Sequence, residues 1–403
     1  MRKQLPWIIS LLAFGILFPN CVKKAPLPPW TSKISMLQAP IGPEEIFRLP
    51  EGNQITFKEL LKDLQTTRVI FVGESHDQIE HHRIQARLLQ NLIAEGRELG
   101  IAMEMFTRSQ QPVLDQWIRG LLTEEEFLKE VQWETTWGID YELYRDILDQ
   151  ARTHRIKVLG LNIERDLVRR VAQNGIEKLS FEDRRKLPEM DLTDQRHRAY
   201  IKSIYKNHQG GVAEDFQYFY EAQSLWDDGM AETLSDYLKS SDGKGKTLLV
   251  LTGSGHVVFG FGIPDRFYRR TSLPYQTIVL KAWKEKLDED FTFTETSSPL
   301  ANFLWLTPFN APVKRRPSIG VVLKKREDQK GLWIERVLPN SPAEKAGLFS
   351  GDHLIMVEGK EIVKGKDIHD AVVQKGSGNS IHFILFREGV KKEISIPLSS
   401  LKD

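Results

Sequence analysis

The stretch Arg68-Val69-Ile70-Phe71-Val72-Gly73-Glu74-Ser75-His76-Asp77 joins a short apolar run directly to a polar turn. The run shows no alternation of polar and apolar residues, which is typical of a strand that is buried on both faces of a parallel sheet. Three more runs have this character, at residues 99–103, 157–161 and 247–251. Apolar spacing predicts helices at residues 78–95, 109–119, 141–153 and 166–174 and at about 213–239. We therefore predict an α/β domain with a mostly parallel sheet covered by helices.

Side chains that can carry chemistry follow these predicted strands. Glu74 and His76 come after the first strand, Glu104 follows the second, and His256 ends the turn Gly253-Ser254-Gly255-His256 after the fourth. Open parallel sheets bind ligands at the carboxyl ends of their strands. We therefore expect Glu74, His76, Glu104 and His256 to converge at one edge of the sheet, which we call the rim.

The residue types at the rim fit two kinds of chemistry. Two histidines and two carboxylates can ligate a divalent metal that keeps one open position, as in hydrolytic sites. A carboxylate that orients a histidine can also serve acid–base catalysis. A structural role stays open for each residue, because Glu and His at strand ends also cap helices or face solvent. Dinucleotide-binding, P-loop and Gly-x-Ser-x-Gly motifs do not occur in the chain.

Other aromatic and histidine residues have less certain roles. One cluster precedes and opens a predicted helix and could stack on a planar macrocycle or pack in a core: Trp133, Trp137, Tyr141 and Tyr144. His81 and His82 lie in the helix after the first strand, where we expect a surface position, although one facing the rim stays open. His197 shows no pattern and is assigned to surface or packing.

The N-terminal region predicts export from the cytoplasm. The chain has 403 residues with 56 Lys+Arg and 55 Asp+Glu, so a net charge of +1 gives no basic surface for nucleic acid. Its one cysteine, Cys21, excludes an internal disulfide. Cys21 follows Met1-Arg2-Lys3 and an apolar run too short to span a membrane, and this arrangement resembles a bacterial lipoprotein signal. We expect a signal peptide at 1–20 and a lipidated, Pro-rich tether at 21–44.

Four motifs stand in order within residues 45–285: Gly73-Glu74-Ser75-His76-Asp77 with His82, Ala102-Met103-Glu104-Met105, the segment 222–231 and Gly253-Ser254-Gly255-His256. Together they resemble the ChaN-like haem-binding uptake family of the Tiki superfamily. The resemblance implies an α/β core and a surface lipoprotein that handles haem in iron acquisition. The wider superfamily implies a metal-dependent hydrolytic site, with the four rim residues as both metal ligands and catalytic residues.

Haem binding without turnover is the first interpretation, and hydrolysis of a peptide or ester the second, so enzymatic activity is left undecided. Haem iron takes an axial Tyr, His, Cys or Met ligand. The candidate haem-binding residues are His76, His82, Tyr141, Tyr144 and His256.

A linker is expected at residues 286–316, followed by a second domain at 317–400. The run from Val337 to Leu348 and Gly351-Asp352-His353-Leu354-Ile355 resemble a bacterial PDZ domain. PDZ domains bind peptide C-termini by adding a strand to a sheet edge. The resemblance implies a groove helix at 367–374 and a loop for the terminal carboxylate at Ser318, Ile319, Gly320 and Val321. A purely structural PDZ domain with an occupied groove stays open.

The sequence thus predicts a lipid-anchored protein of the bacterial cell envelope that faces the periplasm or the cell surface. Its expected partners are haem, a membrane and a protein docked by the PDZ domain, with no nucleic acid. A docking adaptor with a vestigial rim is the third interpretation, and a homodimer stays open.

Overall fold

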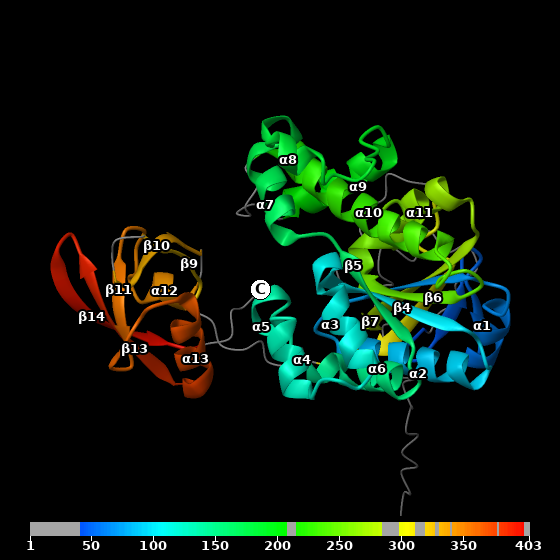
Figure 1. Cartoon of the computed structure of the whole chain (residues 1–403), viewed down its shortest axis with the longest axis horizontal. Coiled ribbons are helices and arrows are strands. Elements are labelled where there is room, and N and C mark those ends of the chain that lie inside the picture. The colour runs from blue at the N-terminus through cyan, green and yellow to red at the C-terminus, as the bar shows by residue number, and fades with distance from the viewer. Residues whose placement is uncertain are drawn as a thin grey trace, which may run out of the picture.

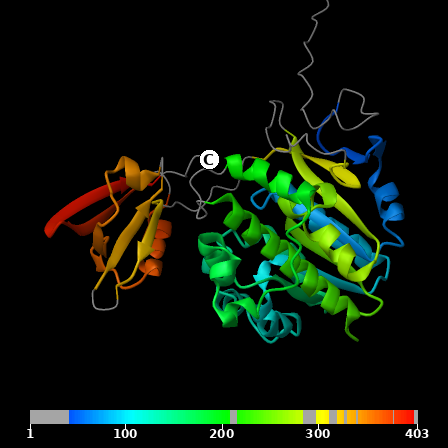
Figure 2. The same ribbon diagram turned by 90° about the horizontal axis from the view of Figure 1, so that it is seen from above.

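The computed structural model describes residues 41–207, 215–283, 298–310, 319–326, 330–338, 341–376 and 379–398. These residues form an α/β domain and a smaller β-rich C-terminal domain, side by side in Figure 1 and in the view from above in Figure 2. The expectations for Cys21 and Ser318 lie outside the described residues. Within the described ranges, no helix is both long and apolar enough to cross a membrane.

An eight-stranded sheet in the order β2-β1-β8-β7-β3-β6-β4-β5 forms the centre of the α/β domain. Six strands run parallel: β3 (Val69–Glu74), β4 (Leu99–Thr107), β5 (Lys157–Asn162), β6 (Thr247–Gly253), β7 (Tyr275–Trp283) and β8 (Phe303–Pro308). β1 (Ile46–Arg48) and β2 (Asn53–Ile55) add an antiparallel edge. Every residue of β3 and β6 is buried, which explains their continuous apolar sequence and confirms the predicted fold class.

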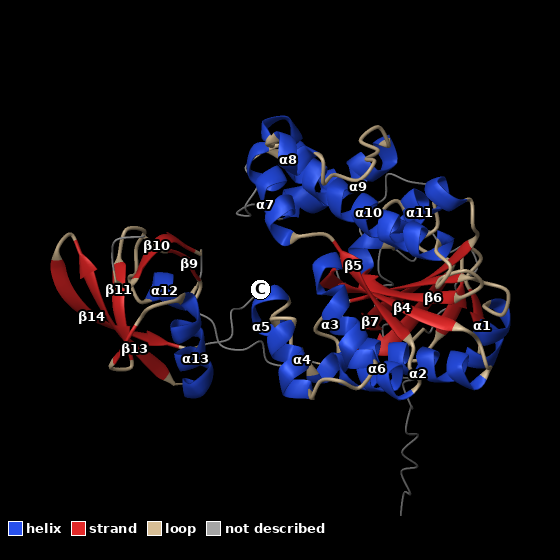
Figure 3. Ribbon diagram, viewed as in Figure 1, coloured by secondary structure: helices blue, strands red, loops and turns tan. Residues whose placement is uncertain are grey.

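Helices cover both faces of this sheet (Figure 3). One face carries α1 (Phe57–Asp63), α2 (Ile79–Ala94), α3 (Gln111–Ile118), α4 (Glu124–Glu130), α5 (Trp133–Thr136) and α6 (Glu142–Thr153). The other carries α9 (Gln195–Asn207), α10 (Phe216–Lys239) and α11 (Ile263–Thr271). α7 (Arg165–Asn174) packs on α10 in a separate apolar cluster, and α8 (Phe181–Arg184) follows it.

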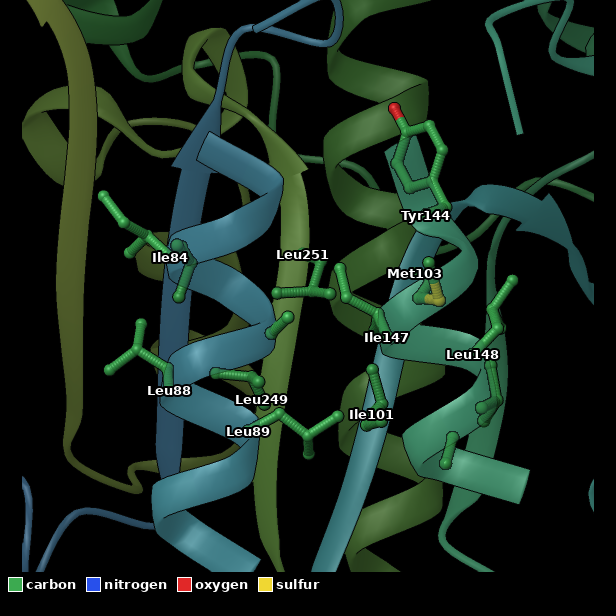
Figure 4. Close-up of a cluster of buried hydrophobic side chains, with 14 of the residues drawn as sticks. Ile84, Leu88, Leu89, Ile101, Met103, Tyr144, Ile147, Leu148, Leu249 and Leu251 are labelled. Carbon is green, nitrogen blue, oxygen red and sulfur yellow. The ribbon is translucent and has the colours of Figure 1, made fainter. Parts of the chain in front are cut away.

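The domain has one apolar core on each face of the sheet, and alternate residues of a strand pack into one core or the other. Ile70 and Val72 of β3 join the core under α2 and α6, whereas Val69 and Phe71 join the core under α10. Figure 4 shows the first core, where apolar side chains from α2, α6, β4 and β6 meet. Because each sheet face packs on its own helices, the strand ends are held rigidly at the edge where the rim lies.

Part of the predicted linker belongs to the sheet. Residues 303–308 form β8, between β7 and β1, although the linker was expected to run through 286–316. The strand is almost wholly buried, with Leu304 and Leu306 fully inaccessible. Because polar residues lie on both sides of this short apolar run, the sequence pattern did not predict a strand here. The predicted helix at 109–119 is likewise divided, since a 3₁₀ turn at Arg108–Gln110 precedes α3.

The C-terminal domain has the sheet order β14-β13-β11-β10-β9, with β12 (Lys360–Glu361) beside β11. Its other strands are β9 (Val321–Lys324), β10 (Leu332–Val337), β11 (His353–Val357), β13 (Ser380–Arg387) and β14 (Val390–Pro397). α12 (Pro342–Lys345) and α13 (Gly365–Lys375) complete the domain. It has its own apolar core, and β9 forms one edge of the sheet. His369 on α13 lies 3.1 Å from Glu134 on α5, a contact between the two domains.

Candidate functional site

The structure brings the four rim residues together. Glu74 ends β3 and pairs in register with Gly253, which ends β6. Glu104 reaches across from β4, where its Oε2 accepts a hydrogen bond of 2.7 Å from the Gly253 amide. His256 lies in the 3₁₀ turn after β6, with its Nε2 3.5 Å from Glu104 Oε1. Residues from three neighbouring strand ends therefore share one small polar site.

Glu74 is the buried anchor of one half of this site. Its Oε1 lies 2.9 Å from His76 Nδ1 and accepts a hydrogen bond of 3.1 Å from Tyr144, while Oε2 accepts one of 2.6 Å from Gln85. His82 Nδ1 lies 3.2 Å from the same Oε2. Burial raises the pKa of Glu74, but the charge of His82 and the hydrogen bonds from His76 and Gln85 lower it below its ordinary value. Glu74 is therefore held as a carboxylate.

His76 is the most accessible side chain of the rim, with 33% of its side-chain surface exposed. Burial lowers its pKa, but the hydrogen bond to Glu74 and the charge of Glu104 raise it above the ordinary value. Its ring packs against that of Trp137, with ring centroids 4.8 Å apart and ring planes at 80°. The bond to Glu74 occupies Nδ1 and fixes the ring orientation, so Nε2 is the nitrogen left to act on a ligand.

A second carboxylate–histidine pair was missed in the sequence. Asp227 on α10 lies with its Oδ1 2.6 Å from His256 Nδ1 and its Oδ2 3.1 Å from His197 Nε2. Arg266 lies behind this pair, its Nη2 3.1 Å from His197 Nδ1. Burial lowers the pKa of His256, but the carboxylates of Glu104 and Asp227 raise it well above the ordinary value. His197, which was assigned to surface or packing, is a buried partner of the site.

The tyrosines and His82 lie where they cannot meet a ligand directly. Tyr144 is 0% and Tyr141 5% exposed, and Figure 4 shows the Tyr144 hydroxyl pointing out of the apolar cluster, where it reaches Glu74. His82 is 2% exposed, and its Nε2 lies 3.0 Å from the His76 carbonyl oxygen. His81 is fully buried as well, so the expected surface position of both histidines is wrong. The Nδ1 atom of His81 accepts a hydrogen bond of 2.8 Å from the Ser75 amide. Tyr144, His82 and His81 thus lie beneath the rim and hold Glu74 and the backbone of residues 75–76 in place by hydrogen bonds.

The rim side chains largely bind one another. Among the residues that the structure describes, no three or more His, Cys, Asp or Glu side chains form a group that could hold a metal ion. Each rim histidine has a buried carboxylate beside its Nδ1 atom, Glu74 for His76 and Asp227 for His256. Glu104 lies between these two carboxylate–histidine pairs. The arrangement can hold a histidine in one orientation and can position a proton, which are the two tasks of a carboxylate–histidine pair.

Tyr144→Phe should lower the free energy of unfolding by about 1–3 kcal/mol. The change leaves Glu74 and the Trp137 indole N–H, which lies 3.2 Å from the Tyr144 oxygen, without this buried partner. Tyr141→Phe is the matched control, because the buried Tyr141 hydroxyl has no hydrogen-bond partner among the described residues. Urea unfolding of both variants measures the difference. Equal losses would show that the Tyr144 hydrogen bonds add nothing.

Acid should destabilise the domain partly through Glu104. Burial raises the pKa of Glu104, but the charge and hydrogen bond of His256, the charge of His76 and the Gly253 amide together lower it from 4.5 to about 2. A carboxylate with a lowered pKa stabilises the fold above its unfolded pKa, and this stabilisation is lost as the pH falls from about 4.5 towards 2. Urea unfolding across this interval should show a smaller loss for Glu104→Gln than for the parent chain. Parallel losses would contradict the assignment.

Comparisons with known proteins agree with this architecture. Residues 60–267 match the model of the family described as haem-binding uptake, Tiki superfamily, ChaN, and residues 317–398 match that of the PDZ domain. The solved structure of Campylobacter jejuni ChaN, titled for its cofacial haem binding, superposes with a TM-score of 0.50 at 20% identity. That match covers 64% of this chain and 95% of the other, and at this identity it shows the fold alone.

The curated relatives match a short stretch of this chain. Serine protease HTRA1 of Xenopus tropicalis is 36% identical over 70 residues, or 17% of this chain and 15% of the relative. A probable periplasmic DegP-like serine endoprotease of a Marinomonas species is 37% identical over 70 residues, with the same coverage of 17% and 15%. The chain thus spans under a fifth of the length of these proteases.

Proposed function

Because the chain belongs to the haem-binding uptake family ChaN of the Tiki superfamily, we propose that it takes up haem at the rim, with His76 as the ligand of the iron. The observation that carries the proposal is the His76 side chain, one-third exposed and bound through Nδ1 to the buried Glu74 at 2.9 Å. A metal-ligating histidine typically donates its other ring N–H to a carboxylate, which fixes the ring and raises its basicity. Histidine is also a common axial ligand of haem iron.

Two glycines keep the surroundings of His76 clear of further side chains. A Cβ atom built on Gly253 would lie 3.0 Å from both Nε2 and Cε1 of His76, so a side chain at this position would crowd the ring. At Gly255 the nearest atom to such a Cβ is the Tyr200 hydroxyl at 3.9 Å, so the turn exposes bare backbone. When bound, haem would supply the iron centre, while Glu74 orients His76 and Trp137 supports its ring.

Haemin titration of the full chain tests the proposal. The chain should give a saturable shift of the Soret band, because a histidine–iron bond changes the electronic spectrum of the porphyrin. A shift no larger than that of a protein-free blank at every concentration would overturn haem binding.

Ester or peptide hydrolysis at the rim is a second candidate, and one observation favours it. His256 lies between the carboxylates of Asp227 and Glu104, an arrangement suited to proton transfer. Turnover of a panel of chromogenic esters and peptides, lost in His256→Ala, would support it. If no substrate is turned over with or without added divalent metal ions, hydrolysis is abandoned.

We also propose that the PDZ domain docks the C-terminus of a protein partner. β9 lies at the sheet edge, where a peptide strand can add. The loop before it turns at Gly320, whose φ is 76°, and the Ile319 carbonyl accepts a hydrogen bond of 2.9 Å from Ala343. A peptide with a free terminal carboxylate should bind, and its amidated twin should not. Equal binding of the two peptides would contradict carboxylate recognition in the loop.

A lipid anchor at Cys21 is proposed for the N-terminus, from the lipoprotein-like sequence around it. The anchor would hold the haem-binding and PDZ domains at the bacterial cell envelope. Metabolic labelling with a fatty acid should mark the parent chain and not Cys21→Ser. Label that persists in Cys21→Ser would remove the anchor from the account.

A further inference from the structure

The short helix α5 connects the outer surface of the α/β domain with the rim. It has a single turn, and the residues that bound it, Gln132 and Gly138, have φ values of 50° and 76°, in the left-handed region. A non-glycine residue in this region persists only where its surroundings hold it, and a one-turn helix is not stable by itself. The position of α5 therefore depends on the contacts that its side chains make.

The inner side of α5 contacts the rim. Trp133 is 3% exposed, and Trp137, which directly follows the helix, packs against the His76 ring at 4.8 Å. The indole N–H of Trp137 also lies 3.2 Å from the Tyr144 oxygen, which donates its own hydrogen bond to Glu74. A displacement of α5 would thus alter both the ring beside His76 and the hydrogen bonds beneath it.

The outer side of α5 contacts the PDZ domain. Glu134 Oε2 lies 3.1 Å from His369 Nε2 on α13, and the two helices face each other in Figure 1. α13 stands where the groove helix of a PDZ domain is expected, and its Ile368 and Val372 are buried in the domain core. A peptide strand that adds to β9 packs against this helix. A shift of α13 on peptide binding would therefore carry His369 with it.

We propose that the PDZ domain controls ligand affinity at the rim through the contact between Glu134 and His369. With the groove empty, this contact holds α5 in place and Trp137 against His76. A peptide beside α13 breaks the contact and lowers the affinity of the rim, so that the ligand is released where a partner has docked. This inference rests on the proposed haem binding and peptide docking, and it adds a regulatory link between them.

Haemin titrations of the full chain, with and without a saturating peptide, measure this link. The probe is the tightest-binding member of a library of pentapeptides with free C-termini, and its amidated twin is the blank. The peptide should weaken haemin binding about two- to fivefold, the size of effect that an exposed ion pair can have. Haemin should weaken peptide binding by the same factor, because coupling between two sites is reciprocal. Unchanged or tighter haemin binding in the presence of the peptide would overturn the inference.

A charge exchange tests whether the link passes through these two side chains. Glu134→Lys should weaken haemin binding without any peptide, by a similar factor, and should abolish the effect of the peptide. Combining Glu134→Lys with His369→Glu restores opposite charges and should restore both properties. Glu130→Lys is the matched control, because Glu130 is an exposed carboxylate at the end of α4, and it should behave as the parent. A double variant as weak as Glu134→Lys would place the effect within α5 and contradict a contact with the PDZ domain.

Amide hydrogen exchange separates failure of this inference from failure of the proposed haem binding. Without haemin, the peptide should speed exchange at residues 132–138 in the parent chain, since less stable segments exchange faster. In Glu134→Lys, exchange there should already be fast and should not respond to the peptide. Faster exchange in a parent chain that binds no haemin would overturn haem as the ligand and keep the release of α5. Unchanged exchange would overturn that release whether or not haemin binds.

Discussion

Asp227→Ala is expected to lower the free energy of unfolding of the α/β domain by about 3–5 kcal/mol, as is usual when one partner is removed from a buried charged network. The side chain is 2% exposed and lies between His256 and His197, at 2.6 and 3.1 Å. Burial raises the pKa of Asp227, but the charge of His256 and the hydrogen bonds of both histidines lower it far below its ordinary value. Without this carboxylate, a positively charged His256 would remain beside Glu104 alone.

Asp242→Ala is the control for the Asp227 prediction. Asp242 pairs with Lys246 at 3.2 Å, but 56% of its side chain is exposed, so its loss should have little effect on stability. Asp227→Asn should fall between the two, since the amide keeps one acceptor oxygen but loses the charge. Urea unfolding followed by both fluorescence and circular dichroism gives the free energies. If Asp227→Ala unfolds with the same midpoint as Asp242→Ala, the buried network does not stabilise the domain.

His76→Ala is expected to weaken haem binding by about 100-fold or more, because it removes the proposed iron ligand itself, whereas changes behind a metal ligand typically cost about 10–100-fold. Its effect on stability should be modest, since the side chain is one-third exposed. Glu74→Gln, which keeps the shape but weakens the bond to Nδ1, should reduce affinity less.

The control for His76→Ala is a histidine away from the rim. His154 is exposed at the C-terminus of α6, and His154→Ala should titrate with haemin as the parent does. Soret titrations of the three variants and the parent at one pH give the comparison. An unchanged dissociation constant for His76→Ala would move the iron ligand to another residue.

The sheet and the rim could be predicted because both follow from strand patterns. Unalternating apolar runs indicate parallel strands, and parallel strands bring the residues that follow them to one edge. Glu74, His76, Glu104 and His256 meet there without any knowledge of helix packing. Strand patterns did not predict the position of β8. One short apolar run in a polar segment does not show which part of the sheet it joins.

Asp227 was missed because its role depends on how α10 packs over the sheet. A signal was nevertheless present, since Asp227 and Asp228 form an acidic pair in a helix segment whose other residues are mostly apolar or small. Carboxylates at such positions are buried and need partners. Asp228 indeed accepts hydrogen bonds from Arg266 at 3.0 Å and Arg269 at 2.9 Å. The burial of Tyr144 was also readable, because Tyr144, Ile147 and Leu148 share one helix face.

The position of the iron tests the central claim most directly. An anomalous difference map recorded at the iron absorption edge, from crystals of the haem complex, locates the metal without any assumption about its ligand. The account predicts one iron peak per chain, bonded to Nε2 of His76 and beside Trp137. A peak elsewhere, for example in the 460 Å³ cavity lined by Gln173, Asp215, Phe216 and Tyr218, would contradict it.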